Sequence, residues 1–198
     1  MNSRAYHHGD LREALLDAAL ASLDADGQLP SWRALARACE VSHTAPYRHF
    51  ANFDALQTAV AAACFRRLTA AVRAATAPLP EPLARLEAGL GAYLRFGVAH
   101  PSWYELMFGR KHTLLRDADV NEASQEAYGT LVAAVTACGV ADAGAVAFAV
   151  WSALHGLTDI ATTNIEPPRS DTPGRAELAA GVIAMCVEYV GRRAGSAG

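Results

Sequence analysis

Apolar residues recur along the chain at spacings of three and four, the period that places side chains on one face of an α-helix. The first such segment is expected to end before Gly27, because glycine tolerates the left-handed backbone that closes many helices. Its repeating positions are Leu11, Leu15, Ala18, Ala19 and Ser22. A short second helix is expected after Ser31 and a third over residues 43–49 after Ser42, since serine caps helix N-termini. Pro46 lies in the first turn of that third helix, where its missing N–H removes at most one helical bond.

Longer helices follow these three. Asn52 is placed to cap a helix over residues 53–76, which a proline-rich stretch then ends. Further helices are expected over residues 83–99, 102–109, 119–138, 143–163 and 175–193. Residues 164–174 are expected to form a mobile connection, and residues 195–198 a flexible tail. The pattern predicts an all-α protein, with an N-terminal helix-turn-helix domain at residues 1–57 and a helical bundle at residues 58–194.

Composition agrees with a helical fold in one or two compact domains. Among the 198 residues are 44 Ala and 21 Leu, against 13 Val and 3 Ile, so good helix formers far outnumber β-branched residues. The longest uncharged apolar stretch, residues 143–158, is shorter than the roughly 20 residues that span a bilayer. His7, His8 and Asp10 stand where a signal peptide needs apolar residues. We therefore expect a cytoplasmic protein without a membrane segment.

The sequence contains little that supports catalysis or metal binding. The four cysteines are far apart, which favours reduced core residues, and the histidines lack ligand spacing, so no metal or cofactor is expected. Ser152, His155 and Asp159 share a helix face and superficially resemble a hydrolase set. However, N–H groups in mid-helix are already bonded and cannot form an oxyanion hole, and no glycine-flanked elbow exposes the serine. We expect no enzyme.

A net charge of −3 gives no overall signal for nucleic acid, so DNA binding would require a local basic face. Such a face is present between residues 31 and 50, where Arg33, Arg37 and Arg48 stand against Glu40. Helix N-termini at Ser31 and Ser42 would add N–H groups and positive dipole ends that suit phosphate oxygens. The second helix of a helix-turn-helix lies in the major groove of DNA.

Three sequence runs together resemble the DNA-binding domain of TetR-family transcriptional regulators: YHHGDLR at residues 6–12, RALAR at 33–37 and VSHTAPYRHF at 41–50. The resemblance implies that Ser31 and Arg33 contact the DNA backbone or a groove edge. It also implies base reading by the recognition helix and phosphate binding by Tyr47 and His49. The complete expected DNA-binding set is Ser31, Arg33, Ser42, His43, Thr44, Ala45, Tyr47, Arg48, His49 and Asn52.

The same residues leave alternatives open, and two positions depart from the family pattern. Phe50 is expected in the small core between the first, third and fourth predicted helices, where Tyr47 and His49 could also pack. Arg37 and Arg48 could be merely solvated charges. Glu40 occupies a turn position that usually carries glycine, at a cost of roughly 1 kcal/mol if the left-handed backbone persists. Phe53 replaces a lysine that usually clamps a phosphate, which should reduce the salt dependence of binding by about one unit of slope.

The C-terminal half suggests a dimer and a ligand pocket. The predicted helices at residues 143–163 and 175–193 are apolar on two sides each, which favours an intersubunit four-helix bundle and a near-palindromic operator. The runs HPSWYELMF at residues 100–108 and WSALHG at 151–156 resemble the WHG type of TetR C-terminal domain, which implies binding of a small effector. This half is rich in aromatic residues, including Tyr93, Phe96, Tyr104, Tyr128 and Phe148. Core packing would use the same residues, but the expected pocket lining is Trp103, Met107, Phe108, Trp151 and His155.

These observations predict a ligand-responsive regulator that binds a DNA operator as a homodimer. The resemblance to the TetR family implies that it is a repressor, which a small, largely apolar effector releases from DNA. The long helix over residues 53–76 would couple the two halves of the chain. The alternative is a helical ligand-binding dimer whose DNA binding is weak or lost.

Overall fold

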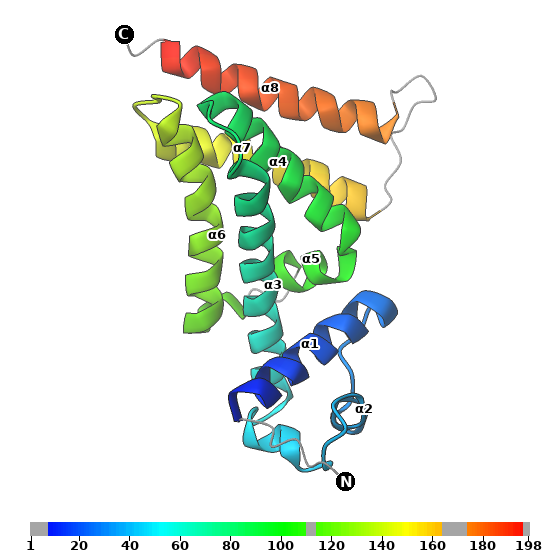
Figure 1. Ribbon diagram of the computed structural model, residues 1–198. Helices are drawn as coiled ribbons and strands as arrows, with labels where there is room; N and C mark the ends of the chain where they lie inside the picture. The colour runs from blue at the N-terminus through cyan, green and yellow to red at the C-terminus, as the bar shows by residue number, and fades with distance from the viewer. Residues whose placement is uncertain (1–7, 110–113, 164–173, 196–198) are drawn as a thin grey trace. The chain divides into compact units, whose positions relative to one another are not determined.

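A computed structural model describes residues 8–109, 114–163 and 174–195, and over these ranges the chain forms only helices, turns and loops (Figure 1). The predicted all-α class is confirmed. In chain order the elements are α1 (His8–Asp26), α2 (Trp32–Ala38), the 3-10 helix η1 (Ala45–Arg48), α3 (Phe53–Thr76), α4 (Pro82–Ala99), α5 (Pro101–Phe108), the 3-10 helix η2 (Leu114–Arg116), α6 (Ala118–Ala137), α7 (Ala143–Thr162) and α8 (Arg175–Gly195). The expected connection at residues 164–174 and the expected tail fall almost wholly outside the described residues.

Two of the three predicted caps are confirmed. Ser31 Oγ accepts a hydrogen bond from the Ala34 N–H at 3.3 Å, and Asn52 Oδ1 accepts one from the Ala55 N–H at 2.8 Å. Each bond satisfies a backbone donor that the first turn of a helix leaves unpaired. Ser42 does not cap a helix, because η1 begins at Ala45 and Thr44 occupies its N-cap position. The Ser42 and Thr44 hydroxyls are hydrogen-bonded to each other at 3.2 Å.

The third predicted helix is shorter and tighter than expected. Residues 43 and 44 form a turn, and only Ala45–Arg48 are helical, with 3-10 geometry. Pro46 explains the difference, since it cannot donate the bond to Ser42 that an α-helix requires and it disfavours α-helical backbone at Ala45. The predicted third helix is therefore confirmed only over Ala45–Arg48, with 3-10 geometry, and its expected extent of residues 43–49 was wrong.

The turn after α2 is closed by Glu40. This residue has a φ of 54°, the only positive φ at a non-glycine residue in the described part of the chain. The Val41 N–H donates to the Ala36 carbonyl at 3.0 Å and the Glu40 N–H to the Arg37 carbonyl at 3.1 Å. These two bonds form a Schellman motif, which requires the left-handed backbone. The strain that the sequence predicted at Glu40 is present.

Replacing Glu40 with glycine should stabilise the chain, because glycine adopts this φ without the steric cost of a Cβ atom. The free energy of unfolding should rise by about 0.5 to 1 kcal/mol, after the greater entropy of glycine in the unfolded chain is subtracted. Urea denaturation measures the change. Glu40→Ala is the matched control, since it removes the same charge but keeps the Cβ; an equal gain in both variants would contradict this explanation.

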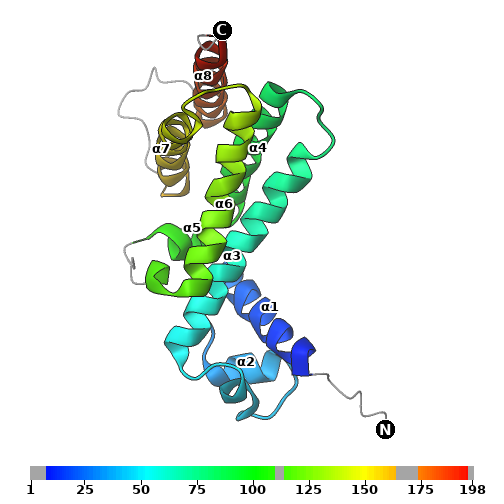
Figure 2. The same ribbon diagram turned by 90° about the vertical axis from the view of Figure 1, so that its left-hand side faces the viewer.

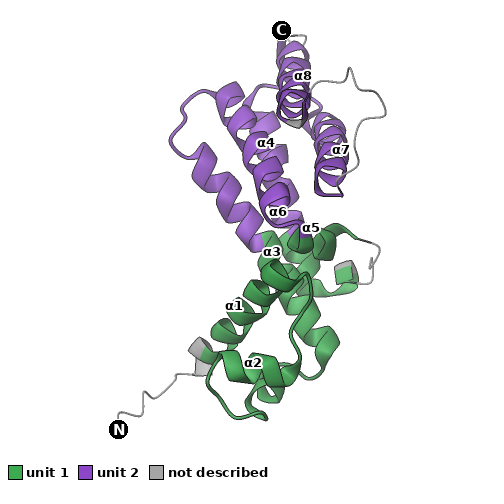
Figure 3. Cartoon of the chain, turned by 90° about the vertical axis from the view of Figure 1, so that its right-hand side faces the viewer, with its two compact units in different colours: residues 1–65, 102–123 green, residues 66–101, 124–198 purple. Residues whose placement is uncertain are grey.

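The chain divides into two compact units, residues 1–65 with 102–123 and residues 66–101 with 124–198 (Figure 3). In the first unit, α1 packs against α2 and α2 against η1 (Figure 2). Leu15, Leu35, Phe50 and Leu56 bring buried apolar side chains from α1, α2, the segment after η1 and α3. The functional boundary expected after residue 57 lies within α3 and stays a prediction.

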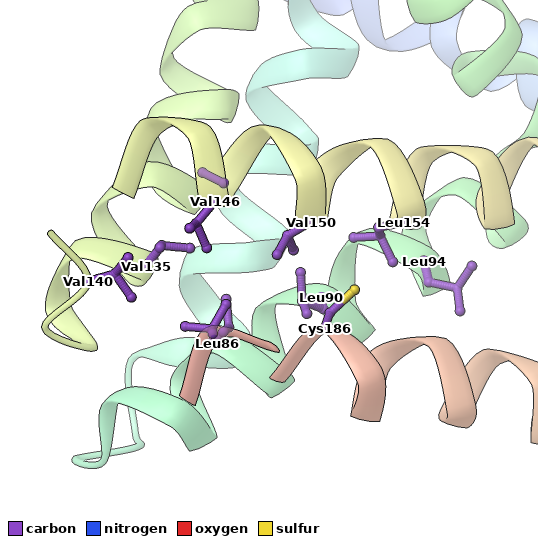
Figure 4. Packing of buried hydrophobic residues seen from close by; sticks show 11 residues of the cluster. Leu86, Leu90, Leu94, Val135, Val140, Val146, Val150, Leu154 and Cys186 are labelled. Carbon is purple, nitrogen blue, oxygen red and sulfur yellow. The ribbon is translucent and has the colours of Figure 1, made fainter. Parts of the chain in front are cut away.

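The second unit is built on α4, α7 and α8, which pack against one another. Figure 4 shows Val150 and Leu154 of α7 facing Leu90 of α4 and Cys186 of α8. The buried members of this core are Leu86, Leu90, Leu94, Val135, Val140, Val146, Ala147, Val150, Leu154, Cys186 and Val190. By length and composition alone, α7 could cross a bilayer, as many core helices of globular proteins could, and 28% of its most apolar stretch is buried within the single chain.

Candidate nucleic-acid interface

The recognition segment, residues 42–49, exposes all its polar side chains except that of His49 and buries Pro46. His43, Thr44, Tyr47 and Arg48 are exposed, whereas Pro46 is buried. Ala45 and His49 are half-buried, and the remaining predicted contact residues are exposed: Ser31, Arg33, Ser42 and Asn52. Eight of the ten predicted DNA-binding residues are therefore exposed to solvent.

Phe50 anchors this segment to the first unit. Its side chain is almost wholly buried, as expected, and the Arg12 guanidinium of α1 lies 5.5 Å from the centre of its ring. This spacing permits a cation–π interaction, which adds to the apolar burial. The Phe50 and His49 N–H groups both donate to the Pro46 carbonyl, so the segment ends in a tight turn. Burial of Pro46 and Phe50 fixes the face that the polar residues present.

Three aromatic side chains, Trp32, Tyr47 and Phe53, form an aromatic cluster that the sequence did not predict. The Trp32 ring lies 5.0 Å from that of Tyr47 and 6.1 Å from that of Phe53, the latter in edge-to-face geometry. Tyr47 is 53% exposed and Phe53 41% exposed, while Trp32 is half-buried. The cluster thus joins the start of α2, the recognition segment and the start of α3 at the molecular surface.

Three of the five predicted effector-binding residues belong to the first unit and pack inside it. Trp103 and Met107 are buried, and the Trp103 indole N–H donates to the Leu20 carbonyl of α1 at 3.1 Å. Phe108 lies 5.3 Å from Phe65 in edge-to-face geometry. All three side chains contribute to the packing of this unit, and their contact with an effector stays a prediction.

The other two, Trp151 and His155, are stacked on each other in the second unit, with ring centres 4.9 Å apart. The Tyr93 hydroxyl and His155 Nδ1 are hydrogen-bonded at 3.2 Å, with the donor set by the histidine tautomer. Tyr128 places its ring edge-on to Trp151 at 6.3 Å. Tyr93 and Tyr128 were among the aromatic residues noted in the sequence but not among the five expected lining residues. The sequence could not pair Tyr93 with His155, since 62 positions separate them.

The environment of His155 favours its neutral form. Removal from water lowers the pKa of His155 below its ordinary value of 6.5, and the nearby Asp159 carboxylate opposes this shift only in part. A neutral imidazole offers one donor and one acceptor. The stacked rings of Trp151 and His155 thus lie beside the Tyr93 hydroxyl, which, like the neutral imidazole, can donate or accept a hydrogen bond.

The lowered pKa of His155 predicts that the free energy of unfolding depends on pH. Just below pH 6.5 the unfolded chain binds a proton at His155 that the folded chain does not, so the free energy of unfolding should fall as the pH falls through this range. Between pH 7.5 and 5.5, the free energy of unfolding measured by urea denaturation should fall less for His155→Gln than for the wild-type chain. An equal loss in the two proteins would show that another group causes the dependence.

Two residues of the apparent hydrolase set, Ser152 and His155, have hydrogen-bond partners outside that set. The Ser152 hydroxyl donates to the Phe148 carbonyl one turn earlier at 2.8 Å, a local bond within α7. Within the described ranges, no three side chains of His, Cys, Asp or Glu are grouped to hold a metal ion. Burial raises the pKa of the thiols of Cys39, Cys138 and Cys186 above the ordinary value, which keeps them protonated.

An exposed polar recognition segment on a small helical unit, in one chain with a helical bundle, is typical of one-component transcriptional regulators. Comparison with known proteins specifies the family. Residues 86–164 match the model of the tetracyclin repressor-like C-terminal domain. A solved structure of a protein of unknown function from Rhodococcus sp. RHA1 is 33% identical with a TM-score of 0.78, and the alignment covers 94% of this chain and 98% of that one. Through the domain at residues 86–164, the chain belongs to the TetR family of transcriptional regulators.

Two more distant structures share the fold. The putative regulatory protein SCO4313 is 22% identical with a TM-score of 0.73, and the alignment covers 94% of this chain and 100% of that one. A TetR-like transcriptional regulator from Rhodococcus sp. RHA1 is 18% identical with a TM-score of 0.62, covering 98% and 99%. No curated protein has a significantly similar sequence. The WHG subtype stays a prediction.

Proposed function

We propose that the protein is a cytoplasmic, ligand-responsive repressor that binds a near-palindromic DNA operator as a homodimer and is released by a small, largely apolar effector. The observation that carries the proposal is the exposure of His43, Thr44, Tyr47 and Arg48 on a segment fixed by buried Pro46 and Phe50. Buried anchors give these polar side chains one defined face, as recognition of a groove requires.

Each exposed side chain has a chemistry suited to duplex DNA. His43 can donate to a purine, and Thr44 offers a hydroxyl and a methyl group for base edges in the major groove. Arg48 and the Tyr47 phenol suit phosphate oxygens, the first as a cation and the second as a neutral donor. The first turn of α3, capped by Asn52, adds the positive end of a 24-residue helix.

Dimerisation through α7 and α8 would bring together two recognition segments related by two-fold symmetry. Phe148 and Ile160 of α7 and Met185 and Tyr189 of α8 are exposed large apolar side chains, although other faces of both helices fill the core. Monomeric proteins seldom expose several large apolar side chains on two adjacent helices. A second copy of the chain would bury these side chains in the intersubunit bundle. Two recognition segments about one duplex turn apart would then match a near-palindrome.

Effector binding would act through the second unit. Trp151, His155 and Tyr93 provide stacking and hydrogen bonding for a compact apolar molecule. Because α3 contributes residues to both units, it would carry a rearrangement from the bundle to the recognition segment. A coupling of roughly 1 to 3 kcal/mol suffices for a change in operator affinity of about 5- to 150-fold.

One observation favours a second candidate, a ligand-binding dimer that has lost DNA binding. Phe53 supplies no cation at the start of α3, and the first turn of that helix contains the acidic Asp54. Under this alternative the chain would bind no duplex selectively, whereas dimerisation and effector binding would remain.

Selection from a pool of random-sequence duplexes tests the proposal. The wild-type chain should enrich a near-palindrome, and Arg48→Ala should weaken binding of the enriched duplex about tenfold or more. It should also reduce the slope of log affinity against log salt by about one unit per subunit. Arg193→Ala, an exposed arginine on α8, is the matched control and should change neither quantity. Equal effects of the two substitutions would place the interface elsewhere.

A further inference from the structure

The aromatic cluster contains the proposed phosphate contact, Tyr47, and two residues outside the expected DNA-binding set, Trp32 and Phe53. Trp32 is the first residue of α2 and Phe53 the first of α3. The centre of the Trp32 ring lies 5.0 Å from that of Tyr47 and 6.1 Å from that of Phe53. All three residues belong to the first compact unit. The cluster is therefore a local arrangement around one exposed phenol.

The geometry restricts the motion of Tyr47. An exposed tyrosine ordinarily samples several rotamers, and fixing one of them on binding costs entropy. Ring pairs at these separations attract each other in tilted and edge-to-face arrangements. Contact with Trp32 therefore favours one position of the Tyr47 ring, and contact with Phe53 favours one position of the Trp32 ring. More than half of Tyr47 nevertheless remains exposed.

The charge at this site is also unusual for a phosphate contact. Phe53 is neutral, and Asp54 follows it in the first turn of α3. An aromatic ring cannot attract a phosphate as an ammonium group does, and 41% of the Phe53 side chain is exposed, so it is not simply a core residue. Phe53 instead contributes an edge-to-face contact to the indole that supports Tyr47.

We propose that Trp32 and Phe53 are positioning residues for Tyr47, which hold its phenol ready to donate a hydrogen bond to a phosphate of duplex DNA. The inference rests on the proposed function and adds a mechanism to it. Affinity is gained by preorganising a neutral donor rather than by adding a cation. Because no counterion is released by a neutral group, this contribution is independent of salt concentration.

A double-mutant cycle on the duplex enriched by the wild-type chain tests the inference. Tyr47→Phe keeps the ring and removes the donor, so affinity should fall about tenfold or more, the usual effect of losing a hydrogen bond to a charged group. Phe53→Ala should weaken binding about three- to tenfold, because the phenol is still present but less well positioned. In the double variant, affinity should equal that of Tyr47→Phe alone, because no hydroxyl remains to be positioned.

Two further variants separate positioning from general damage to the fold. Phe53→Tyr keeps the ring contact and should retain affinity within about twofold. Phe53→Ala should leave the salt slope unchanged, whereas Phe53→Lys should steepen it by about one unit per subunit. Thermal unfolding should show all variants folded, which is expected because Phe53 is a partly exposed residue at a helix end.

Each outcome has a defined meaning. Losses that multiply in the double variant would overturn the positioning role, as would failure of Phe53→Tyr to restore binding. Equal competition by a single strand of the same sequence would show that the rings stack on unpaired bases, which also overturns it. If the wild-type chain enriches no duplex at all, the proposed function itself fails, an outcome distinct from duplex binding with multiplicative losses.

Discussion

Glutamate at both Phe148 and Met185 should produce a folded monomer whose affinity for the selected duplex is at least about 100-fold lower. The two side chains are 59% and 54% exposed in the single chain, so the substitutions should not disturb its core. In a dimer they would bury carboxylates without partners at a two-fold interface, which costs several kcal/mol. A monomer carries one recognition segment and loses the contacts of the second half-site. Light scattering measures the mass, and a duplex titration measures the affinity.

Val98→Glu is the matched control for this experiment, because Val98 is an exposed apolar residue on α4, outside the proposed interface. It should leave the dimer and its DNA binding intact. If Phe148→Glu with Met185→Glu also remains dimeric, the intersubunit bundle is wrong. If the wild-type chain is monomeric and binds lipid vesicles, the exposed apolar surface of α7 binds a membrane rather than a second chain.

Leu154→Ala should lower the free energy of unfolding by about 3 kcal/mol. Leu154 is 2% exposed and lies in the core that α4, α7 and α8 share. Deleting three carbon atoms there loses their transfer from water and leaves a cavity that neighbouring helices cannot fully close, an effect that ranges from about 2 to 5 kcal/mol. Denaturation in urea, followed by far-ultraviolet circular dichroism, measures the change.

Leu83→Ala provides the comparison within the same unit. Leu83 lies near the start of α4 and is exposed, so the same chemical change should cost less than about 1 kcal/mol. Similar losses at the two positions would contradict the assignment of the core to the α4, α7 and α8 contact.

The long helices could be predicted from the sequence because local signals agree with the burial pattern. The helix over residues 53–76 has an amide cap at Asn52 and a proline-rich end, and the structure places α3 over the same residues. The recognition segment was less predictable because the effect of Pro46 depends on how the next residues pack. A proline in the first turn is compatible with an α-helix, but here the chain continues as a single 3-10 turn anchored by buried Phe50.

In the candidate site too, features set by neighbouring residues could be predicted from the sequence, whereas contacts between separate elements could not. Exposure of His43, Thr44 and Arg48 follows from their polar character in a short segment. The ring contacts of Trp32 with Tyr47 and Phe53 join three elements, and no spacing in the sequence encodes them. Trp32 lies three residues before buried Leu35, a spacing that places both on one helix face, yet Trp32 is only half-buried because it is the first residue of α2.

The most direct test of DNA recognition by paired recognition segments is a titration of the enriched duplex with light-scattering detection of the complex. Two chains should bind each near-palindromic duplex with a dissociation constant on the order of 10 nM or below at physiological salt, and a scrambled duplex should bind at least about 1,000-fold more weakly. Equal binding of the two duplexes, or no binding below micromolar protein, would contradict operator recognition by a dimer.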